Sequence, residues 1–172
     1  MPPFFPTTDL CDQHLGDDSG AFRVLAPVFK DFGMLKRFHG PVFTVQCRND
    51  NTSVKAALES PGWLETSSGR VPQVLVVAGG ASLDSALMGG KLGAYAVSNG
   101  WAGVVIDGCV RDVVELSQCA VGIRALAPVP MPTQRRWAGQ TQVAVQIQGV
   151  WVRPGDWLYA DEDGMVVSAM PL

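Results

Sequence analysis

Residues 104–116, VVIDGCVRDVVEL, decide the fold and point to the chemistry of this chain. The stretch opens with a short apolar run rich in β-branched side chains, which is typical of a buried strand. After Gly108 it presents Arg111 and Asp112 side by side, and the residues that follow predict a short helix over 111–119. Ligands of open α/β sheets bind where a strand ends and such a helix begins. The adjacent cation and anion are therefore candidate functional residues.

Arg111 and Asp112 suit the binding of an anion and a metal ion. Free backbone N–H groups at a helix start favour anions, and a guanidinium can grip a carboxylate through two hydrogen bonds. An aspartate can hold a hard divalent cation such as Mg²⁺, which takes one or two carboxylates and keeps several waters. A helix-capping aspartate beside a surface arginine would explain the same two residues without any ligand. The residues alone leave both interpretations open.

Apolar runs elsewhere in the chain predict further strands. Residues 73–80, QVLVVAGG, form a continuous run that is typical of a central strand covered on both faces. Residues 101–108 form another such run, residues 41–47 alternate apolar and polar side chains, and residues 122–128 predict one more strand. Because helical patterns separate these runs, the sequence favours an α/β fold with a parallel or mixed sheet and helical crossovers.

Three helical segments are expected outside the opening stretch. The first lies near the start of the chain and is capped by Thr7 or Thr8. The second follows a polar turn and is capped by Asn51 or Thr52. The third covers residues 82–100, where the apolar spacing predicts two helices or one helix broken at paired glycines.

The last part of the chain changes character. Residues 141–168 show strand after strand with turn signals between them and no helical pattern. Residues 60–72 are expected to form a loop, and residues 23–33 a loop or an edge strand. No linker, internal repeat or low-complexity segment is visible. We therefore expect an α/β middle and an all-β end within a single domain, residues 1–172.

A second candidate site is MGGKLG, residues 88–93. Adjacent glycines weaken a helix, but they allow backbone to approach a ligand closely. A helix starting at Lys91 would present free N–H groups from about Gly90 to Leu92. A plain turn between two helices explains the glycines equally well. The spacing is not that of a phosphate-binding P-loop, because Leu92 stands where a Ser or Thr would bind the metal.

Composition excludes several classes of protein. The 172 residues carry a net charge of −3, so nothing suggests the clustered basic face that nucleic-acid binding needs. The one local candidate, QRRW at residues 134–137, is more typical of a loop or a subunit contact. No apolar run reaches the roughly 18 residues that span a membrane. Charged residues are only 17 %, and there are five tryptophans, which suggests that other subunits cover some of the surface.

The cysteines do not suggest a metal site. None of the four shows the C-x-x-C spacing, and only His14 and His39 accompany them, so buried reduced thiols are expected and zinc is not. Free thiols without a signal peptide favour the cytoplasm. Both histidines are expected to be surface or packing residues. YADEDG, residues 159–164, lacks the spacing of a calcium loop and predicts a hairpin turn, while Asp9 and Asp12 are interpreted as capping residues.

Residues 79–116 make the chain resemble the family that includes the regulator of ribonuclease activity A and the class II 4-hydroxy-4-methyl-2-oxoglutarate aldolases. Other matching stretches follow in the same order: TTDLCD, FKDFG, FHGPVFTVQC, DNTSVKAAL and GVWVRPGDWLYADEDGMVV. The resemblance covers nearly all of residues 8–167. It implies a swivelling β/β/α fold and a homotrimer, sometimes doubled to a hexamer, with active sites in clefts between subunits.

The resemblance also implies a reaction. In the aldolase branch, retro-aldol cleavage releases pyruvate, and oxaloacetate decarboxylation is a related activity. Carried onto this chain, Arg111 would bind the carboxylate and keto oxygens of the substrate and Asp112 would be the metal ligand. The backbone amides of residues 89–92, Gly89, Gly90, Lys91 and Leu92, would hold the substrate carboxylate. Mg²⁺ is the expected cation and Mn²⁺ the alternative.

Three positions depart from the family pattern. The resemblance places an acid 21 residues before the arginine, where this chain has Gly90, and an Asp-Gly-Gly strand end appears here with Ala78 in place of the acid. A Leu-Asp-Ile-Gly stretch is replaced by residues 119–122, CAVG, which we interpret as a packing difference. Loss of a supporting acid commonly costs about 10–100-fold in metal affinity or activity.

Two main functions remain from the sequence, beside that of a degenerate relative which binds another 2-oxo acid or none. The first is a metal-dependent lyase that releases pyruvate from a 2-oxo acid, and the alternative is a non-catalytic regulator that binds ribonuclease E. Asp112 favours the lyase, whereas Gly90 favours the regulator. A methyltransferase label that has been attached to this family finds no adenosylmethionine-binding pattern here and is rejected.

Overall fold

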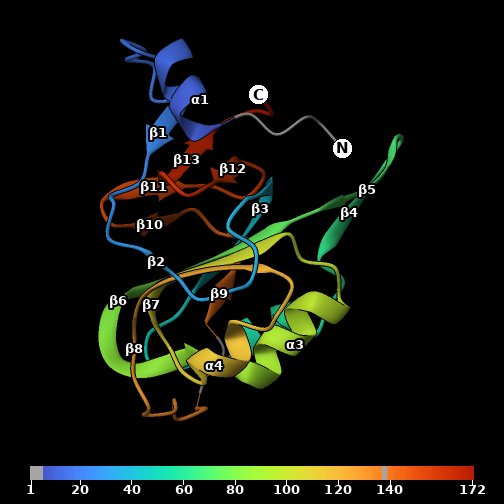
Figure 1. Ribbon diagram of the computed structural model, residues 1–172, viewed down its shortest axis with the longest axis vertical. Helices are drawn as coiled ribbons and strands as arrows, with labels where there is room; N and C mark the ends of the chain where they lie inside the picture. Colours follow the sequence, from blue (N-terminus) through green and yellow to red (C-terminus); the bar gives the residue numbers. More distant parts are fainter. Residues whose placement is uncertain (1–5, 137–138) are drawn as a thin grey trace.

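Four parallel strands form the centre of the main sheet (Figure 1). The computed structural model describes residues 6–136 and 139–172, so Trp137 of the QRRW stretch lies outside the described residues. The four strands pair in the order β3, β6, β7 and β8, and every residue of β7 is buried, as expected for parallel strands covered on both faces. Their bounds are β3 Phe38–Gln46, β6 Val74–Met88, β7 Gly103–Val110 and β8 Gly122–Pro128. The predicted mixed α/β class is confirmed.

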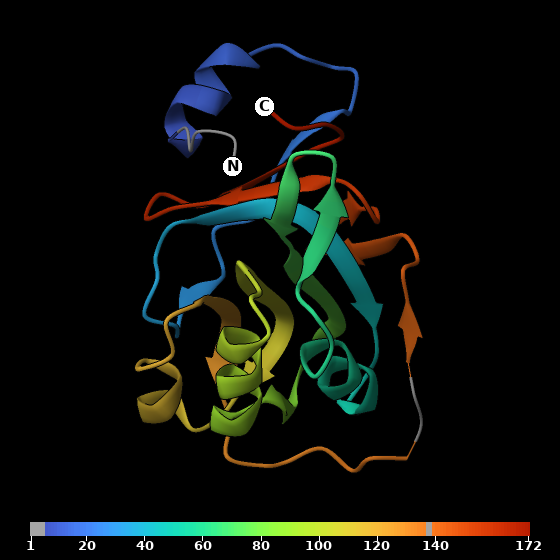
Figure 2. The same cartoon turned by 90° about the vertical axis from the view of Figure 1, so that its right-hand side faces the viewer.

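Three short helices follow the first three of these strands and lie together below the sheet (Figures 1 and 2). They are α2, Thr52–Leu58, after β3; α3, Gly90–Ser98, after β6; and α4, Val113–Leu116, after β7. The inner face of α2 is buried as predicted, through Val54, Ala57 and Leu58, and α3 buries Leu92 and Ala96. Because each helix starts at the carboxyl end of a parallel strand, the helix starts meet at one edge of the sheet.

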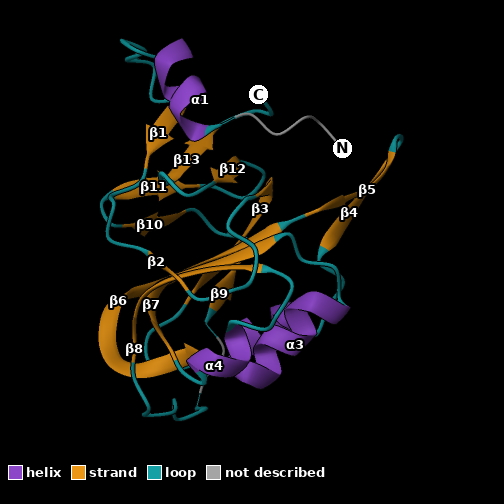
Figure 3. Cartoon of the chain, in the orientation of Figure 1, coloured by secondary structure: helices purple, strands orange, loops and turns teal. Residues whose placement is uncertain are grey.

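Antiparallel strands extend the same sheet on both sides, which makes it mixed. β12 pairs with β3, β13 with β12 and β1 with β13, while β2 and β9 pair with β8 and β3. A separate hairpin joins β10 to β11. The strand bounds are β1 Phe22–Val24, β2 Lys30–Asp31, β9 Gln140–Thr141, β10 Val145–Ile147, β11 Val150–Val152, β12 Trp157–Ala160 and β13 Met165–Ser168. The predicted all-β end is confirmed, with the C-terminus on that side of the molecule (Figure 3).

Each face of the sheet has its own hydrophobic core. One core lies between the parallel strands and helices α2 to α4, and it includes Val54, Leu75 and Leu116. The other lies on the opposite face and includes Val76 and Leu158. A third, smaller cluster holds the N-terminal helix α1, Thr7–Gln13, against β12 and β13. The helices and the parallel strand ends are therefore fixed by packing from both faces.

The structure corrects the helix expected over residues 82–88. These residues continue β6, which runs to Met88 through several register shifts against β7. Gly80 and Ala81 both have positive φ, and the strand curls strongly there (Figure 1). Leu83, expected to face inward, is 58 % exposed. Pairing with β7 overrides the helical spacing, and only the second predicted helix, α3, forms.

Other local expectations were also wrong. Residues 60–72 are not a loop but contain a hairpin, β4 Trp63–Thr66 and β5 Gly69–Pro72, which projects from the body (Figure 1). Helix α1 begins at Thr7 after Pro6, and no side chain caps it, so neither threonine nor Asp9 or Asp12 has the predicted capping role. Helix α4 has four residues, fewer than the stretch 111–119 suggested.

Several minor expectations are confirmed. Asp163 and Gly164 lie in the turn that joins β12 to β13. All four cysteines are free, as expected, but only Cys109 is buried, whereas the other three are partly exposed. His39 is buried and stacks on Tyr159, and His14 stacks on Phe22, so both histidines are packing residues. Within residues 6–136 and 139–172, no helix has the length and apolar character needed to cross a membrane.

Candidate active site

One cavity of about 510 Å³ lies where β6 and β7 end and where α3 and α4 begin. It brings together Arg111, Asp112, Gly89, Lys91 and Leu92, all of which the sequence had singled out. Gly90 does not line the cavity, but its N–H donates a hydrogen bond to Asp112. The lining residues are Asn51, Lys55, Ala86, Met88, Gly89, Lys91, Leu92, Arg111, Asp112, Pro132, Thr133 and Arg135.

Asp112 adopts an uncommon backbone conformation. It has φ 56° and ψ 45°, the left-handed region, which residues other than glycine seldom adopt, although aspartate tolerates it better than most. It occupies the N-cap position of α4, yet its side chain does not cap that helix. Instead Oδ2 accepts a hydrogen bond of 3.1 Å from the N–H of Gly90, at the start of α3. The carboxylate thus joins two helix starts, and capping of its own helix does not explain it.

Position 89 has no room for a side chain, so it requires glycine. Its φ of −138° suits any residue, so conformation does not demand glycine. A Cβ built there would lie 2.5 Å from Asp112 Oδ2 and 3.2 Å from Arg111 Cγ. The glycine therefore makes room for the two side chains.

Glu115 occupies the space beside Gly90. A Cβ at Gly90 would overlap the Glu115 carboxylate, whose Oε2 is the nearest atom. The chain thus holds an acid close to position 90, although that acid is carried by α4 rather than by residue 90 itself. Sequence reasoning missed Glu115. Its spacing of three residues from Asp112, close to one helical turn, was the available signal.

Arg111 and Asp112 form only a loose ion pair. Arg111 Nε lies 3.9 Å from Asp112 Oδ2, and the two side chains are 42 % and 43 % exposed. Exposed pairs of this kind contribute little stability, roughly 0–1 kcal/mol. The backbone N–H of Arg111 donates to the Met88 carbonyl and fixes the strand end. Both charged groups consequently remain available to a ligand in the cavity.

The start of α3 offers two free amides. The N–H of Gly90 is used by Asp112, and the N–H of Gly93 donates to the Gly89 carbonyl. Among the described residues, the N–H groups of Lys91 and Leu92 have no acceptor. The predicted carboxylate-binding segment is thus reduced to these two amides. With Arg111 and Lys91 near, this wall of the cavity favours an anion.

The cavity lining also includes residues that the sequence analysis did not assign to the site. Lys55 comes from α2, and Thr133 and Arg135 come from the loop that follows β8. The lining contains four cationic side chains and one carboxylate, in a chain whose net charge is −3. This concentration of positive charge favours a ligand with more than one negative charge.

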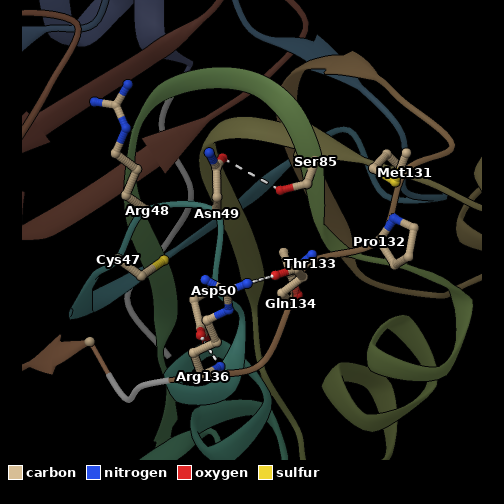
Figure 4. Close-up of a pocket in the computed structure, with 11 residues that line it drawn as sticks. Cys47, Arg48, Asn49, Asp50, Ser85, Met131, Pro132, Thr133, Gln134 and Arg136 are labelled. Atoms are coloured by element: carbon tan, nitrogen blue, oxygen red, sulfur yellow. Dashed lines mark hydrogen bonds between the residues drawn. The ribbon is translucent and has the colours of Figure 1, made fainter.

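A second cavity, of about 630 Å³, shares Pro132 and Thr133 with the first (Figure 4). In it Asn49 turns toward Ser85, whereas Arg48 points away from the other labelled residues. Cys47 also lines this cavity, but burial, with a smaller effect from Asp50, raises its pKa to about 12. The thiol therefore stays protonated at neutral pH and is no nucleophile. Arg111 and Asp112 do not line this second cavity, whose charged lining residues are Arg48, Asp50 and Arg136.

The residues at Asp112 fit a hydrated divalent cation. Among residues 6–136 and 139–172, no three His, Cys, Asp or Glu side chains gather as a complete metal site. Asp112 alone offers a half-exposed carboxylate whose Oδ1 accepts no hydrogen bond from the described residues. Mg²⁺ is commonly held by one or two carboxylates and several waters, so one carboxylate in an open cavity suits it. A closed zinc site needs more protein ligands.

Comparison with known proteins identifies the family. The family described as RraA-like, Aldolase/RraA, matches residues 7–167. A protein of Albidiferax ferrireducens, named "Putative 4-hydroxy-4-methyl-2-oxoglutarate aldolase", is 67 % identical over 169 residues, which cover 98 % of each chain. A second protein with that name, from Burkholderia multivorans, is 50 % identical over 98 % of each chain.

Solved structures agree. The RNA-processing inhibitor RraA from Thermus thermophilis has a TM-score of 0.87 and 39 % identity, covering 99 % of this chain and 96 % of that one. The match and its coverage confirm the fold and the family that the sequence motifs indicated. The chain belongs to the Aldolase/RraA family.

Proposed function

We propose that this protein is a divalent-metal-dependent lyase that releases pyruvate from a 2-oxo acid. The reaction is of the 4-hydroxy-4-methyl-2-oxoglutarate aldolase or oxaloacetate decarboxylase type. The observation that supports it most is the meeting of Arg111, Asp112 and two free α3 amides in one cationic cavity. The names of the related proteins favour an aldolase.

In this proposal each group has a separate task. The amides of Lys91 and Leu92 bind the substrate carboxylate, and the Arg111 guanidinium lies against the 2-oxo oxygen. When the C3–C4 bond breaks, its electron pair moves toward that oxygen, and Arg111 stabilises the enolate charge that develops. The other fragment leaves as CO2 from oxaloacetate, or as a 2-oxo acid from the aldol substrate, whose C4 hydroxyl gives its proton to water. A proton from water then adds to C3 of the enolate and gives pyruvate. Asp112 would hold Mg²⁺ or Mn²⁺, which supplies a Lewis acid for the same charge. The loose pairing of Arg111 with Asp112 leaves both free for these tasks.

Glu115 places a carboxylate close to position 90, where this chain lacks the acid of the family pattern. Its carboxylate lies against Gly90, where an acid on residue 90 would otherwise project. We propose that Glu115 supports the water structure around Asp112 in place of that acid. Glu115→Gln is then expected to reduce turnover by about tenfold, the low end of what such supporting groups contribute. Glu65→Gln, which removes an exposed acid on the β4–β5 hairpin, serves as the charge control.

The alternative is a regulator that binds a ribonuclease of the E type. The structural similarity to the RNA-processing inhibitor from Thermus thermophilis favours it. A non-catalytic binder, however, has no need for an aspartate held in a left-handed conformation beside an open cavity.

The proposed enzyme is a cytoplasmic homotrimer or hexamer, and neighbouring subunits would close the open side of the cavity.

One assay separates the two functions. Oxaloacetate turnover is measured with Mg²⁺ and with an excess of chelator, above the rate that Mg²⁺ alone produces in buffer. We expect chelator-sensitive turnover that falls at least about 10²-fold in Arg111→Ala and in Asp112→Ala. Arg70→Ala, on the exposed β4–β5 hairpin, is the matched control. Equal turnover in all four proteins would exclude the lyase.

A further inference from the structure

We propose that an apolar groove at the amino ends of the parallel strands is the docking site for the first five residues of this chain, MPPFF. Phe38 begins β3, and Ala102 immediately precedes β7, so the groove lies at the opposite end of the strands from the candidate active site. No residue lines both the groove and the active-site cavity. The docking therefore goes beyond the proposed function and does not depend on it.

The groove has a volume of about 590 Å³ and a mainly apolar lining. Phe38 and Trp101 are its buried aromatic side chains, each 5 % exposed, whereas Leu35 and Val97 are 42 % and 40 % exposed. Contiguous apolar surface of this kind commonly marks an interaction site. The lining residues are Leu35, Arg37, Phe38, His39, Pro72, Val97, Gly100, Trp101, Ala102 and Ala120.

The fold fixes both aromatic rings of the groove. A Cβ at Gly103 or at Gly122 would overlap the Phe38 ring, so the two glycines make room for it. The indole Nε1 of Trp101 donates to the Ser60 carbonyl at 3.3 Å. Because these walls are set in advance, an occupant would bind without the cost of ordering them.

The described chain begins beside this groove. The N–H and the hydroxyl of Thr7 donate to the Asp161 carboxylate at 2.7 and 2.6 Å. Asp161 directly follows Ala160, which lies opposite Phe38 where β12 pairs with β3. Neighbouring strands are only about 4.8 Å apart. The segment that precedes Thr7 is therefore tethered next to the strand that carries Phe38.

The length of the segment is sufficient. The six residues before Thr7 span at most about 20 Å when extended. One hydrogen-bonded contact and one strand spacing separate Thr7 from β3. The turn that holds Thr7 also borders the groove, since Glu162, next to Asp161, pairs with the lining residue Arg37 at 2.9 Å.

The composition of the segment matches the groove. MPPFF has no charged side chain, and each of its two phenylalanines can bury about 150–250 Å². Proline-rich segments are typical ligands of grooves with aromatic walls, and prolines reduce the conformational freedom that is lost on binding. Arg37 already has an acidic partner in Glu162, so the groove favours an uncharged occupant over an acidic one.

The test separates the segment from the groove. A shortened chain lacks residues 2–5 and retains every described residue. A labelled peptide with the sequence of residues 1–7, MPPFFPT, is titrated into the shortened chain and into the full chain, and fluorescence anisotropy measures binding. We expect a Kd of about 10⁻⁴ M for the shortened chain. Because a short tether gives an effective concentration in the mM range, the full chain should bind the peptide about tenfold more weakly.

Substitutions in the groove and in the peptide locate the binding. In the shortened chain, Leu35→Lys and Val97→Lys place a charge on partly exposed apolar positions of the groove, and each should weaken binding at least about fivefold. Leu15→Lys, at a position that is 89 % exposed and outside the groove, is the matched control and should bind as before. A peptide that carries Phe4→Ser and Phe5→Ser should not bind.

Three results would overturn the docking. They are the absence of binding to the shortened chain, equal binding to the shortened and full chains, and binding that survives both groove substitutions. Sedimentation of the full chain tests a second copy as the occupant instead. A change of oligomeric state in Val97→Lys, without binding of the peptide to the shortened chain, would assign the groove to that second copy and likewise overturn the proposal.

Discussion

Asp112 and Asp161 each follow a strand of the main sheet, and the chain uses them in opposite ways. Asp161 comes after β12, is 3 % exposed and has both carboxylate oxygens engaged. Its oxygens accept from the N–H and hydroxyl of Thr7 at 2.7 and 2.6 Å and from the N–H groups of Asp163 and Gly164 at 3.0 and 3.3 Å. Asp112 comes after β7, is 43 % exposed and accepts one such bond.

The comparison separates a carboxylate whose acceptor capacity is used by the fold from one that keeps acceptor capacity free. Burial alone would raise the pKa of Asp161, but the hydrogen bonds from Thr7, Asp163 and Gly164 outweigh it and lower the pKa. That carboxylate is fully used in holding α1 to the β12–β13 turn. Asp112 has unused acceptor capacity, sits in a left-handed conformation and faces a cavity. We propose that this uncommon conformation serves a ligand.

The largest expected effect comes from Asp112→Asn. Asparagine tolerates the left-handed conformation and can still accept the Gly90 N–H, so the fold should keep its stability within about 0.5 kcal/mol. The charge that would hold the cation is lost, and kcat/KM for oxaloacetate should fall by about 10²- to 10³-fold. Steady-state kinetics and thermal unfolding of the same preparation measure both. A stability loss without a loss of turnover would show that Asp112 is structural after all.

Asp161→Ala should show the reverse pattern. Four donors lose their acceptor in a buried site, and the free energy of unfolding should fall by roughly 3 kcal/mol, or about 6–12 °C in Tm. Turnover measured well below the lower Tm should stay at the wild-type value, because Asp161 is outside both cavities. Asp163→Ala, an exposed neighbour in the same turn, is the control and should change stability by less than about 0.5 kcal/mol.

A glycine beside each aspartate sharpens the contrast. In Gly89→Ala the new methyl meets Asp112 Oδ2, so the carboxylate must shift and turnover should fall by about tenfold. Gly164 has φ 158° with open space around it, so Gly164→Ala strains the backbone of the turn and should cost about 1 kcal/mol of stability. Paired kinetic and urea-unfolding measurements test both. If Gly89→Ala affects stability alone, the close approach at position 89 has no catalytic meaning.

The central strands could be predicted because they are buried on both faces. Residues 73–80 and 101–108 read as unbroken apolar runs, and only parallel strands with covered faces look like that. The extension of β6 over residues 82–88 could not be predicted. Leu83, Ala86 and Leu87 have helical spacing, and what decides the outcome is pairing with β7 beyond a left-handed Ala81.

The candidate site could likewise be predicted only in part. Arg111, Asp112 and the Gly89–Leu92 segment could be placed near one another because the carboxyl ends of neighbouring parallel strands meet. Arg135 could not be, since a loop held by Asn51 brings it there and no local pattern describes that hydrogen bond. Lys55 lies in α2, after the end of β3, so the same argument could have placed it near the site.

The smallest predicted effect concerns acid stability. The pKa of Asp161 is about 3.9 in the unfolded chain and lower in the folded protein. As the pH falls, the unfolded chain therefore binds the proton before the folded protein does. The stability that Asp161 contributes is therefore complete above about pH 4 and is lost as the pH falls through the folded pKa.

Thr7→Val removes the hydroxyl donor, should cost about 1 kcal/mol at neutral pH and should bring the folded pKa of Asp161 back toward its ordinary value. Urea unfolding from pH 6 to pH 3 should then show the variant and the wild-type protein converging as the pH falls, because protonation removes in the wild type what the substitution has already removed. A constant difference across that range would mean that the hydroxyl stabilises the fold without acting on the Asp161 charge.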